Sequence, residues 1–306
     1  TGRTRNRSLG LMSTLATLDQ CLRQAQSLGL ARVDAQILLL HSLQRPLHDR
    51  AWLLAHDSDT LMPAQAAAWQ DALQRRLSGE PVAYITGRKD FFGLTLAVDA
   101  RVLDPRPDTE TLVEWALTCL PEFKPESRSE STPAPSKGSP RILDLGTGSG
   151  AVALALQHTR PDVTVWAVDA SEDALAVARA NAARLQLGVQ FIASDWLNAV
   201  DVQHTGRFDL IVSNPPYVAE GDPHLAALTH EPLQALTSGP DGLDDIRQII
   251  AQAPTFLSPG GWLLLEHGWD QAAPVQALLR EAGFEQVQSR RDLSDIERCT
   301  GAAMPK

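Results

Sequence analysis

The sequence is poor in cysteine, and its three cysteines, Cys21, Cys119 and Cys299, stand far apart. No two of them form a Cys-x-x-Cys pair, and the eight histidines show no spacing typical of metal ligands. We therefore expect reduced thiols in a cytoplasmic protein, and neither a disulfide framework nor a metal site.

Long apolar runs are also lacking, since no stretch reaches the roughly 20 residues that a membrane-spanning helix needs. Positive charge is in deficit as well, because 27 lysines and arginines face 37 aspartates and glutamates, for a formal net charge of −10. An acidic surface does not attract phosphate backbones over long range. The composition thus argues against a membrane protein and against a protein that coats nucleic acid.

The chain has 306 residues, of which 43% are hydrophobic, enough for one large domain and a smaller one. Residues 1–12 contain three arginines but no apolar signal core, and we interpret them as an extension or tag. From residue 13 to about 80, apolar residues recur at helical spacing, and Pro63 is suited to open a helix. This range predicts a small helical domain, with Trp52 and Trp69 in its core.

Three further segments organise the chain before residue 141. Residues 81–105 place β-branched and aromatic residues around Gly93, which favours a strand pair, and we assign this range as a hairpin linker. Residues 104–110 carry proline and acidic side chains of the kind that begin a helix. Residues 121–140 are rich in proline and serine, and we expect a surface connector without a function of its own.

From residue 141 onward, short apolar strands alternate with helical segments, one of which has Ser171 as its N-cap. The predicted strands are 142–145, 163–168, 190–193, 210–212 and 262–265. Such alternation predicts an α/β domain over residues 106–306, with a doubly wound parallel sheet covered by helices on both faces. Ligands bind these sheets at the carboxyl ends of the strands.

Two of those strand ends carry residues suited to a nucleotide-like ligand. Residues 144–150 read Asp-Leu-Gly-Thr-Gly-Ser-Gly, a turn whose glycines let the backbone approach a ligand closely. Their spacing differs from the Gly-x-Gly-x-x-Gly of dinucleotide sites, which disfavours an NAD-dependent oxidoreductase, and a plain tight turn is an alternative. Asp169 ends the second strand, where a carboxylate either accepts hydrogen bonds from ribose hydroxyls or begins the next helix.

Asp195 and Trp196 follow the third strand. They offer a polar acceptor and a flat apolar surface that together suit an adenine. The alternative is that Trp196 belongs to the core.

The most specific signal is Ser-Asn-Pro-Pro-Tyr at residues 213–217, after the fourth strand. Two consecutive prolines stop strand pairing and hold the Asn214 side chain and the Pro215 carbonyl as rigid acceptors. A planar amide or exocyclic amine would donate its N–H groups to them, so that its lone pair points at an electrophilic carbon. We take Asn214, Pro215 and Tyr217 as candidate catalytic residues and include Pro216 in the substrate-binding loop. A rigid loop without a ligand is the alternative.

These segments resemble known motifs. Residues 142–150 look like motif I of class I methyltransferases, and residues 214–217 look like the motif that amino-methyltransferases of adenine and guanine share. More narrowly, the chain from about residue 13 resembles the release factor glutamine methyltransferases. The closer match lies in residues 80–87, 91–94, 105–110, 230–232, 241–243 and 263–268.

The resemblance implies a seven-stranded Rossmann-like methyltransferase domain preceded by a helical domain and a hairpin that hold the substrate. It implies transfer from S-adenosyl-L-methionine, with S-adenosyl-L-homocysteine as product, to N5 of the glutamine in the Gly-Gly-Gln motif of class-1 peptide chain release factors. The predicted cofactor contacts are Gly146, Thr147, Gly148, Gly150, Asp169, Asp195, Trp196, Asn214, Arg106 and Thr109. We expect a monomer that acts in translation termination without binding nucleic acid or a membrane directly.

Three alternatives stay open. A ribosomal-protein glutamine methyltransferase would be a close relative, although residues 265–269 favour the release factor branch by resemblance. A nucleic-acid exocyclic-amine methyltransferase would share the Asn-Pro-Pro-Tyr loop but should carry a basic recognition region, which the sequence does not supply. A non-catalytic binding module is disfavoured because both the loop and the glycine turn are intact.

Overall fold

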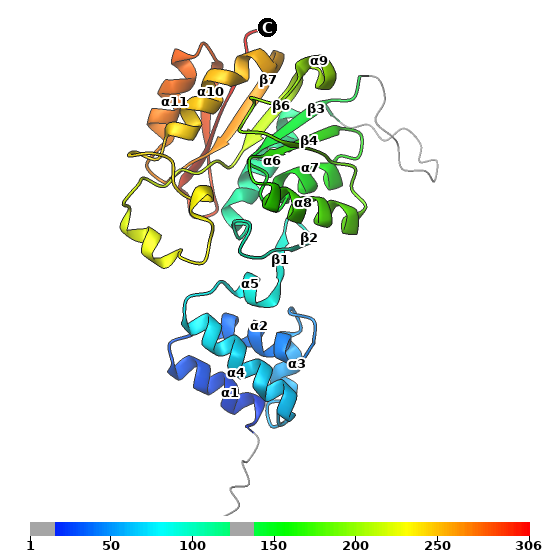
Figure 1. Cartoon of the computed structure of the whole chain (residues 1–306), viewed down its shortest axis with the longest axis vertical. Helices are drawn as coiled ribbons and strands as arrows, with labels where there is room; N and C mark the ends of the chain where they lie inside the picture. Colours follow the sequence, from blue (N-terminus) through cyan, green and yellow to red (C-terminus); the bar gives the residue numbers. More distant parts are fainter. Residues whose placement is uncertain (1–15, 123–137) are drawn as a thin grey trace, which may run out of the picture. The chain divides into compact units, whose positions relative to one another are not determined.

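The computed structural model describes residues 16–122 and 138–306, which form two compact units divided between Thr86 and Gly87. The extension predicted at residues 1–12, and residues 123–137 of the predicted connector, lie outside the described residues. Figure 1 shows both units and labels most of their helices and strands. Within the described ranges, no helix combines the length and the apolar character that crossing a membrane requires.

The described part of the first unit is a helical bundle around one apolar core. Its helices are α1 (Leu18–Ser27), α2 (Arg32–Ser42), α3 (Arg50–Ala55), α4 (Pro63–Leu77) and α5 (Val82–Thr86). Thr17 caps α1 through a capping box with Gln20, and Pro63 opens α4 as predicted. Trp69 is fully buried and Trp52 packs against the same core at its edge, which confirms the prediction that both belong to it.

The second unit begins with the hairpin of β1 (Arg88–Phe91) and β2 (Leu94–Ala97), which confirms the strand pair predicted around Gly93. The two residues between the strands, Phe92 and Gly93, both have positive φ, at +46° and +76°. This is the geometry of a tight two-residue hairpin turn. A short 3₁₀ turn, η1 (Pro107–Thr109), then leads into α6 (Glu110–Cys119), where a helix was predicted.

A seven-stranded sheet, in the order β5-β4-β3-β6-β7-β9-β8, forms the centre of the second unit. Its strands are β3 (Arg141–Leu145), β4 (Thr164–Asp169), β5 (Gln190–Ala193), β6 (Phe208–Ser213), β7 (Leu257–Glu266), β8 (Glu285–Arg291) and β9 (Glu297–Ala303). The first five are the predicted strands and run parallel. The sheet is nevertheless mixed, because only residues 292–296 join β8 to β9, and so short a connection forces an antiparallel pair.

Helices cover both faces of this sheet (Figure 1). The remaining helical segments are α7 (Ala151–Thr159), α8 (Glu172–Leu185), α9 (Val202–Thr205), η2 (Pro223–Ala227), η3 (Leu233–Ala235), α10 (Asp244–Phe256) and α11 (Ala272–Glu281). Leu143 and Leu145, alternate residues of β3, point into a core shared with α10 and α11, while α6, α7 and α8 lie on the other face. Ser171 caps α8 by accepting from the Ala174 N–H at 3.2 Å, as predicted.

The order of the strands reverses between β3 and β6. The chain runs outward through β4 and β5, returns to β6 beside β3, and then continues outward through β7. Such a reversal leaves a crevice at the carboxyl ends of the two central strands. The predicted signals follow β3, β4, β5 and β6, so the topology brings them to this one edge.

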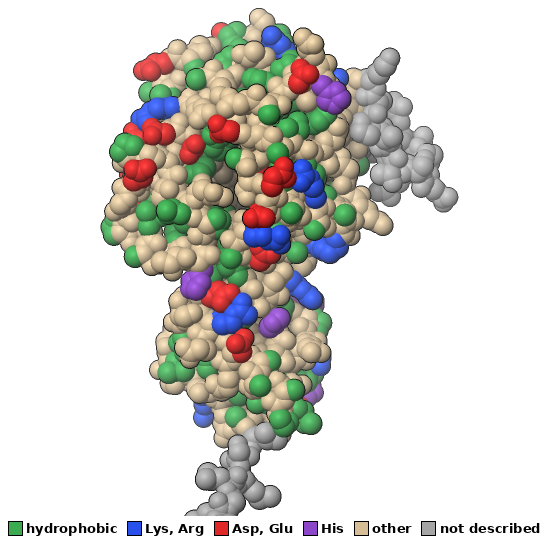
Figure 2. Space-filling model, in the orientation of Figure 1, with side chains coloured by type: hydrophobic (Ala, Val, Ile, Leu, Met, Phe, Trp, Pro, Cys, Tyr) green, Lys and Arg blue, Asp and Glu red, His purple; other side chains and the backbone are tan. Residues whose placement is uncertain are grey.

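On the face drawn in Figure 2, single basic side chains are interspersed among acidic ones.

Candidate functional site

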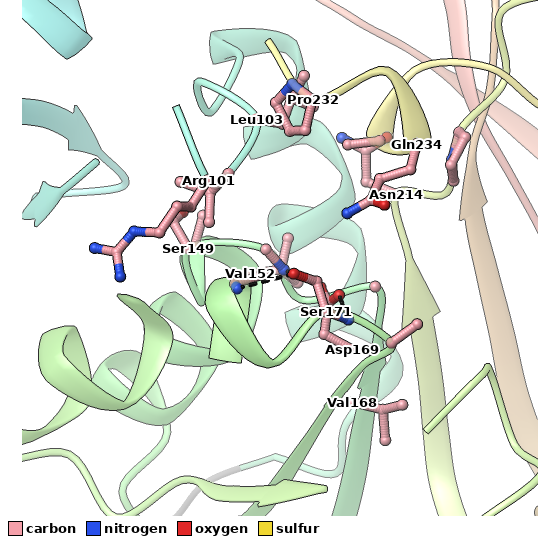
Figure 3. Close-up of a pocket in the computed structure, with 18 of the residues that line it drawn as sticks. Arg101, Leu103, Ser149, Val152, Val168, Asp169, Ser171, Asn214, Pro232 and Gln234 are labelled. Carbon is pink, nitrogen blue, oxygen red and sulfur yellow. Dashed lines mark hydrogen bonds between the residues drawn. The ribbon is translucent and has the colours of Figure 1, made fainter. Parts of the chain in front are cut away.

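A cavity of about 430 Å³ lies at this edge, within the second unit. Its walls come from the β3–α7 turn, the ends of β4, β5 and β6, the segment 101–109, and the loop around 232–235. Figure 3 shows Asp169, Asn214 and Gln234 arranged around it from three different segments. The volume is typical of a pocket that encloses a small organic ligand.

The glycine turn after β3 uses its glycines for different purposes. Gly148 has φ +56°, and no atom of the described residues lies within 4 Å of the place where a Cβ would stand. Gly150 has φ +85°, and a Cβ there would come within 2.9 Å of Leu154 Cδ1 and 3.3 Å of Ala178 Cβ. Gly148 therefore borders the open cavity, whereas Gly150 permits the packing of α7 against α8.

A buried carboxyl holds this turn in shape. Asp144 Oδ2 accepts from Thr147 Oγ1 at 2.6 Å and from the Ala153 N–H at 3.2 Å. Burial raises the pKa of Asp144 to about 7. Gly146 and Gly148 line the cavity, whereas Thr147 and Gly150, which were also predicted to contact the cofactor, are not among its described lining residues.

Asp169 lines the cavity at the end of β4. Its Oδ1 accepts from the Ser171 N–H at 2.9 Å, and its Oδ2 accepts from the Gly148 N–H at 2.8 Å. Burial raises the pKa of Asp169, and these backbone donors act in the opposite direction. Each carboxylate oxygen has two lone-pair directions, so both retain a position that a ligand hydroxyl could use.

Trp196 follows β5 with φ +47°, and its ring lies against Gly146, where a Cβ would approach the ring to 3.3 Å. Its Nε1–H donates to Asp245 Oδ1 at 3.1 Å, at the start of α10. Asp195, Trp196 and Asp245 all line the cavity. The sequence did not single out Asp245, because nothing local connects it with a tryptophan 49 residues earlier.

The Asn-Pro-Pro-Tyr loop begins where Ser213 Oγ–H donates to the Leu145 carbonyl at 2.8 Å and so fixes the end of β6 against β3. Asn214 and Pro216 line the cavity, whereas the described lining residues do not include Pro215 or Tyr217. The Asn214 Nδ2 donates to Thr109 Oγ1 at 3.1 Å, and Thr109 lines the cavity as well.

Glu266, at the end of β7, is the residue behind Asn214 that the sequence did not identify as part of the site. It is 1% exposed, and burial raises the pKa of its carboxyl to about 7. Hydrogen bonds with Thr109 and Asn214 oppose that rise. The sequence feature that could have identified Glu266 is its position as an acidic residue directly after the apolar run 262–265.

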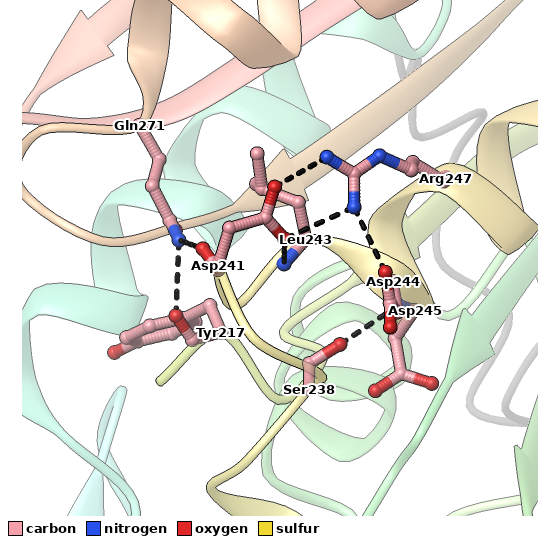
Figure 4. Close-up of polar contacts among 8 residues, drawn as sticks. All are labelled: Tyr217, Ser238, Asp241, Leu243, Asp244, Asp245, Arg247 and Gln271. Carbon is pink, nitrogen blue, oxygen red and sulfur yellow. Dashed lines mark hydrogen bonds and ion pairs between the residues drawn. The ribbon is translucent and has the colours of Figure 1, made fainter. Parts of the chain in front are cut away.

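Tyr217 is held through its backbone. Gln271 Nε2 donates to the Tyr217 carbonyl at 3.0 Å and to the Asp241 carbonyl at 3.2 Å, as Figure 4 shows. Burial raises the pKa of the Tyr217 phenol further above neutral pH. The loop after Asn214 thus rests on a fixed support, which suits the positioning of a bound group.

Arg106 was predicted to contact the cofactor, but its guanidinium pairs instead with Glu231, whose side chain is 2% exposed, and lies 3.5 Å from Asp104. The described residues that line the cavity do not include Arg106. Pro232, the neighbour of Glu231, does line it, as does Pro105. The ion pair between Arg106 and Glu231 therefore connects the cavity wall around Pro105 with the wall around Pro232.

Comparisons with known proteins agree with this architecture. The model of the methyltransferase small domain matches residues 133–241, and that of the PrmC N-terminal domain matches residues 14–87. The release factor glutamine methyltransferase of Bordetella pertussis is 49% identical, over 89% of this chain and 95% of the relative. That of Escherichia coli K12 is 42% identical, over 92% and 96%.

This chain belongs to the release factor glutamine methyltransferase family. As a member it is a methyltransferase, and the predicted seven-stranded Rossmann-like fold is confirmed. Two solved structures share that fold at low identity. A methyltransferase from Pyrococcus furiosus is 18% identical with a TM-score of 0.51, over 78% of this chain and 100% of that one. The hMettl16 catalytic domain is 15% identical with a TM-score of 0.54, over 82% and 84%.

Proposed function

We propose that this chain methylates N5 of the glutamine in the Gly-Gly-Gln motif of class-1 peptide chain release factors, using S-adenosyl-L-methionine. The observation that carries the proposal is the orientation of Asn214. Its Nδ2 donates to Thr109, which leaves Oδ1 as an acceptor for a substrate amide at the cavity. Family membership over nearly the whole chain supports the choice of substrate.

The residues around the cavity fit the proposed cofactor. Gly148 leaves open space beside its backbone, Asp169 offers carboxylate oxygens to ribose hydroxyls, and Trp196 offers an indole face to adenine. Asp195 and Asp245 add polar acceptors beside the indole. When bound, S-adenosyl-L-methionine supplies a methyl group on a positively charged sulfur, which keeps the electron pair of the broken C–S bond.

An amide nitrogen is a weak nucleophile because its lone pair is delocalised. Asn214 Oδ1 and the Pro215 carbonyl would accept its two N–H groups and orient the lone pair, and Tyr217 would stack on the amide plane. As the N–C bond forms, positive charge develops on nitrogen, and both acceptors stabilise it. The nitrogen then loses one proton to solvent. Glu266, the carboxyl behind Asn214, is engaged with Thr109 and Asn214 and is not required as a base.

The helical first unit would hold the release factor. Its match to the PrmC N-terminal domain supports this assignment. We propose that the enzyme acts as a monomer and recognises its protein substrate without contacting nucleic acid.

The test is transfer of a labelled methyl group from S-adenosyl-L-methionine to a purified class-1 release factor. We expect label on the wild-type release factor and none on a variant in which the motif glutamine is replaced by glutamate. Asn214→Ala should reduce transfer by about 100-fold or more, as loss of one preorganised acceptor does. Equal labelling of the glutamate variant, or label only on ribosomal protein or RNA, would overturn the proposal.

A further inference from the structure

Three side chains from distant parts of the chain meet behind the cavity. Glu266 ends β7, Thr109 ends η1, and Asn214 follows β6. Asn214 Nδ2 donates to Thr109 Oγ1 at 3.1 Å, and Thr109 and Asn214 both act on the Glu266 carboxyl to lower its pKa. Thr109 and Asn214 line the cavity, whereas Glu266 is almost fully buried.

The chemistry of an asparagine amide makes this arrangement directional. The amide has two N–H donors at one end and a carbonyl acceptor at the other, and the two ends have nearly the same shape. Its neighbours therefore decide which end faces a ligand. Arg298 favours the ionised form of Glu266, and an ionised carboxylate can only accept, so Glu266 favours the donor end of the Asn214 amide on its side. Asn214 Nδ2 donates to the Thr109 hydroxyl, whose own hydrogen is then free to donate to Glu266.

We propose that Glu266 is a positioning residue, which together with Thr109 locks the Asn214 amide so that Oδ1 faces the substrate. This inference rests on the proposed function only for the identity of that substrate. Without the carboxylate, the Asn214 amide can rotate and present its N–H groups to the amide of the substrate, where two donors would face each other. Glu266 acts through Asn214 and does not touch the substrate.

The burial of Glu266 supports a role beyond packing. Burying a carboxyl is unfavourable unless it is fully paired, yet no described residue partners its Oε2. Arg298 and Asp108 are the charged groups that shift the pKa of Glu266, and Glu266 in turn raises the pKa of Tyr217 and of Cys299. Arg298 favours the ionised form of Glu266 and Asp108 opposes it. A hydrophobic residue would fill this place at lower cost if packing were its only purpose.

Matched substitutions separate positioning from folding. Glu266→Gln keeps the shape but adds a donor that can face the Asn214 carbonyl, and Thr109→Val removes the hydroxyl that Thr109→Ser keeps. We expect kcat to fall by about tenfold or more in Glu266→Gln and Thr109→Val, with a smaller change in KM, and we expect Thr109→Ser to recover most of the activity that Thr109→Val loses. Equal kcat in Glu266→Gln and wild type would overturn the proposal.

A measurement without substrate tests whether Glu266 acts on the Asn214 amide. The chain has four asparagines, so protein labelled with ¹⁵N only at asparagine gives few side-chain amide signals, and Asn214→Ala identifies that of Asn214. We expect this signal to shift with pH around 7, where burial places the Glu266 pKa, and the shift to vanish in Glu266→Gln. A signal that responds equally in Glu266→Gln would contradict the proposal. Because no release factor is present, this result stands apart from the outcome of the methyl-transfer test.

Discussion

Replacing Gly148 with alanine should separate cofactor binding from folding. Gly148 has φ +56°, so alanine there adopts a left-handed backbone at a cost of about 1–2 kcal/mol. No described atom lies within 4 Å of the new methyl group, so no clash adds to that cost. Gly150→Ala is the matched control, because it combines φ +85° with a contact of 2.9 Å to Leu154 Cδ1. Strain and overpacking together should destabilise that variant by about 2–5 kcal/mol.

Binding of the cofactor product should show the reverse order: Gly148→Ala should lose more affinity than Gly150→Ala. Gly148 borders the cavity, so its added methyl group occupies space that we assign to the cofactor. We expect affinity for S-adenosyl-L-homocysteine to fall by about 10- to 100-fold, equivalent to about 1.4–2.8 kcal/mol, in calorimetric titration. In Gly150→Ala the protein that remains folded should bind within a few-fold of wild type, while urea unfolding shows the larger loss of stability.

The reasoning fails if Gly148→Ala binds the cofactor product as tightly as wild type. The cofactor would then lie away from the β3–α7 turn, and the role assigned to this wall of the cavity would be wrong. A loss of stability in Gly148→Ala as large as that in Gly150→Ala would contradict the account in another way, since it would mean that the open space beside Gly148 is not available in the folded protein.

Three further predictions concern other parts of the site. Arg106→Ala should destabilise the fold by about 3–5 kcal/mol in urea unfolding, because it removes the cation paired with the buried Glu231 and leaves only the Asp104 N–H donating to that carboxylate, and adding Glu231→Gln should recover part of that loss. Asp144 and Glu266 have pKa values raised to about 7, so the folded state binds more protons than the unfolded state, and their contribution to stability falls as pH rises from about 4 to 7. For Glu266, the rise of the pKa from 4.5 to about 7 corresponds to a stability change on the order of 3 kcal/mol, and Glu266→Gln should flatten this dependence in unfolding curves measured across that range. Trp196→Ala should weaken S-adenosyl-L-homocysteine binding more than Trp196→Phe, which keeps an aromatic face, and equal losses in calorimetry would argue against stacking.

Local sequence patterns were sufficient for the centre of the fold. Five strands are short apolar runs, and the chemistry after β3, β4, β5 and β6 is encoded in adjacent residues such as the glycine turn and the two prolines. β8 was not recognised from its residues because it has no apolar run. Most of its side chains are exposed or half-buried, and Glu285, Gln286 and Arg291 read as a polar segment.

The remaining features of the site depend on residues that only folding brings together. Arg106 and Glu231 are 125 residues apart, and no local pattern connects the guanidinium with that carboxylate, so their pairing could not be predicted. Glu266 is likewise 157 residues from Thr109 along the chain. Sequence motifs indicate which residues face a ligand, whereas the groups that orient them become visible only in the packed structure.

The central claim is most directly tested by locating the transferred methyl group. A class-1 release factor incubated with this enzyme and S-adenosyl-L-methionine would be digested, and its Gly-Gly-Gln peptide fragmented in a mass spectrometer. The account predicts the added mass of one methylene on the glutamine side chain, and its loss when Asn214→Ala replaces the wild-type enzyme. An unmodified glutamine, despite demonstrated binding of the cofactor, or a methyl group on another residue would contradict it.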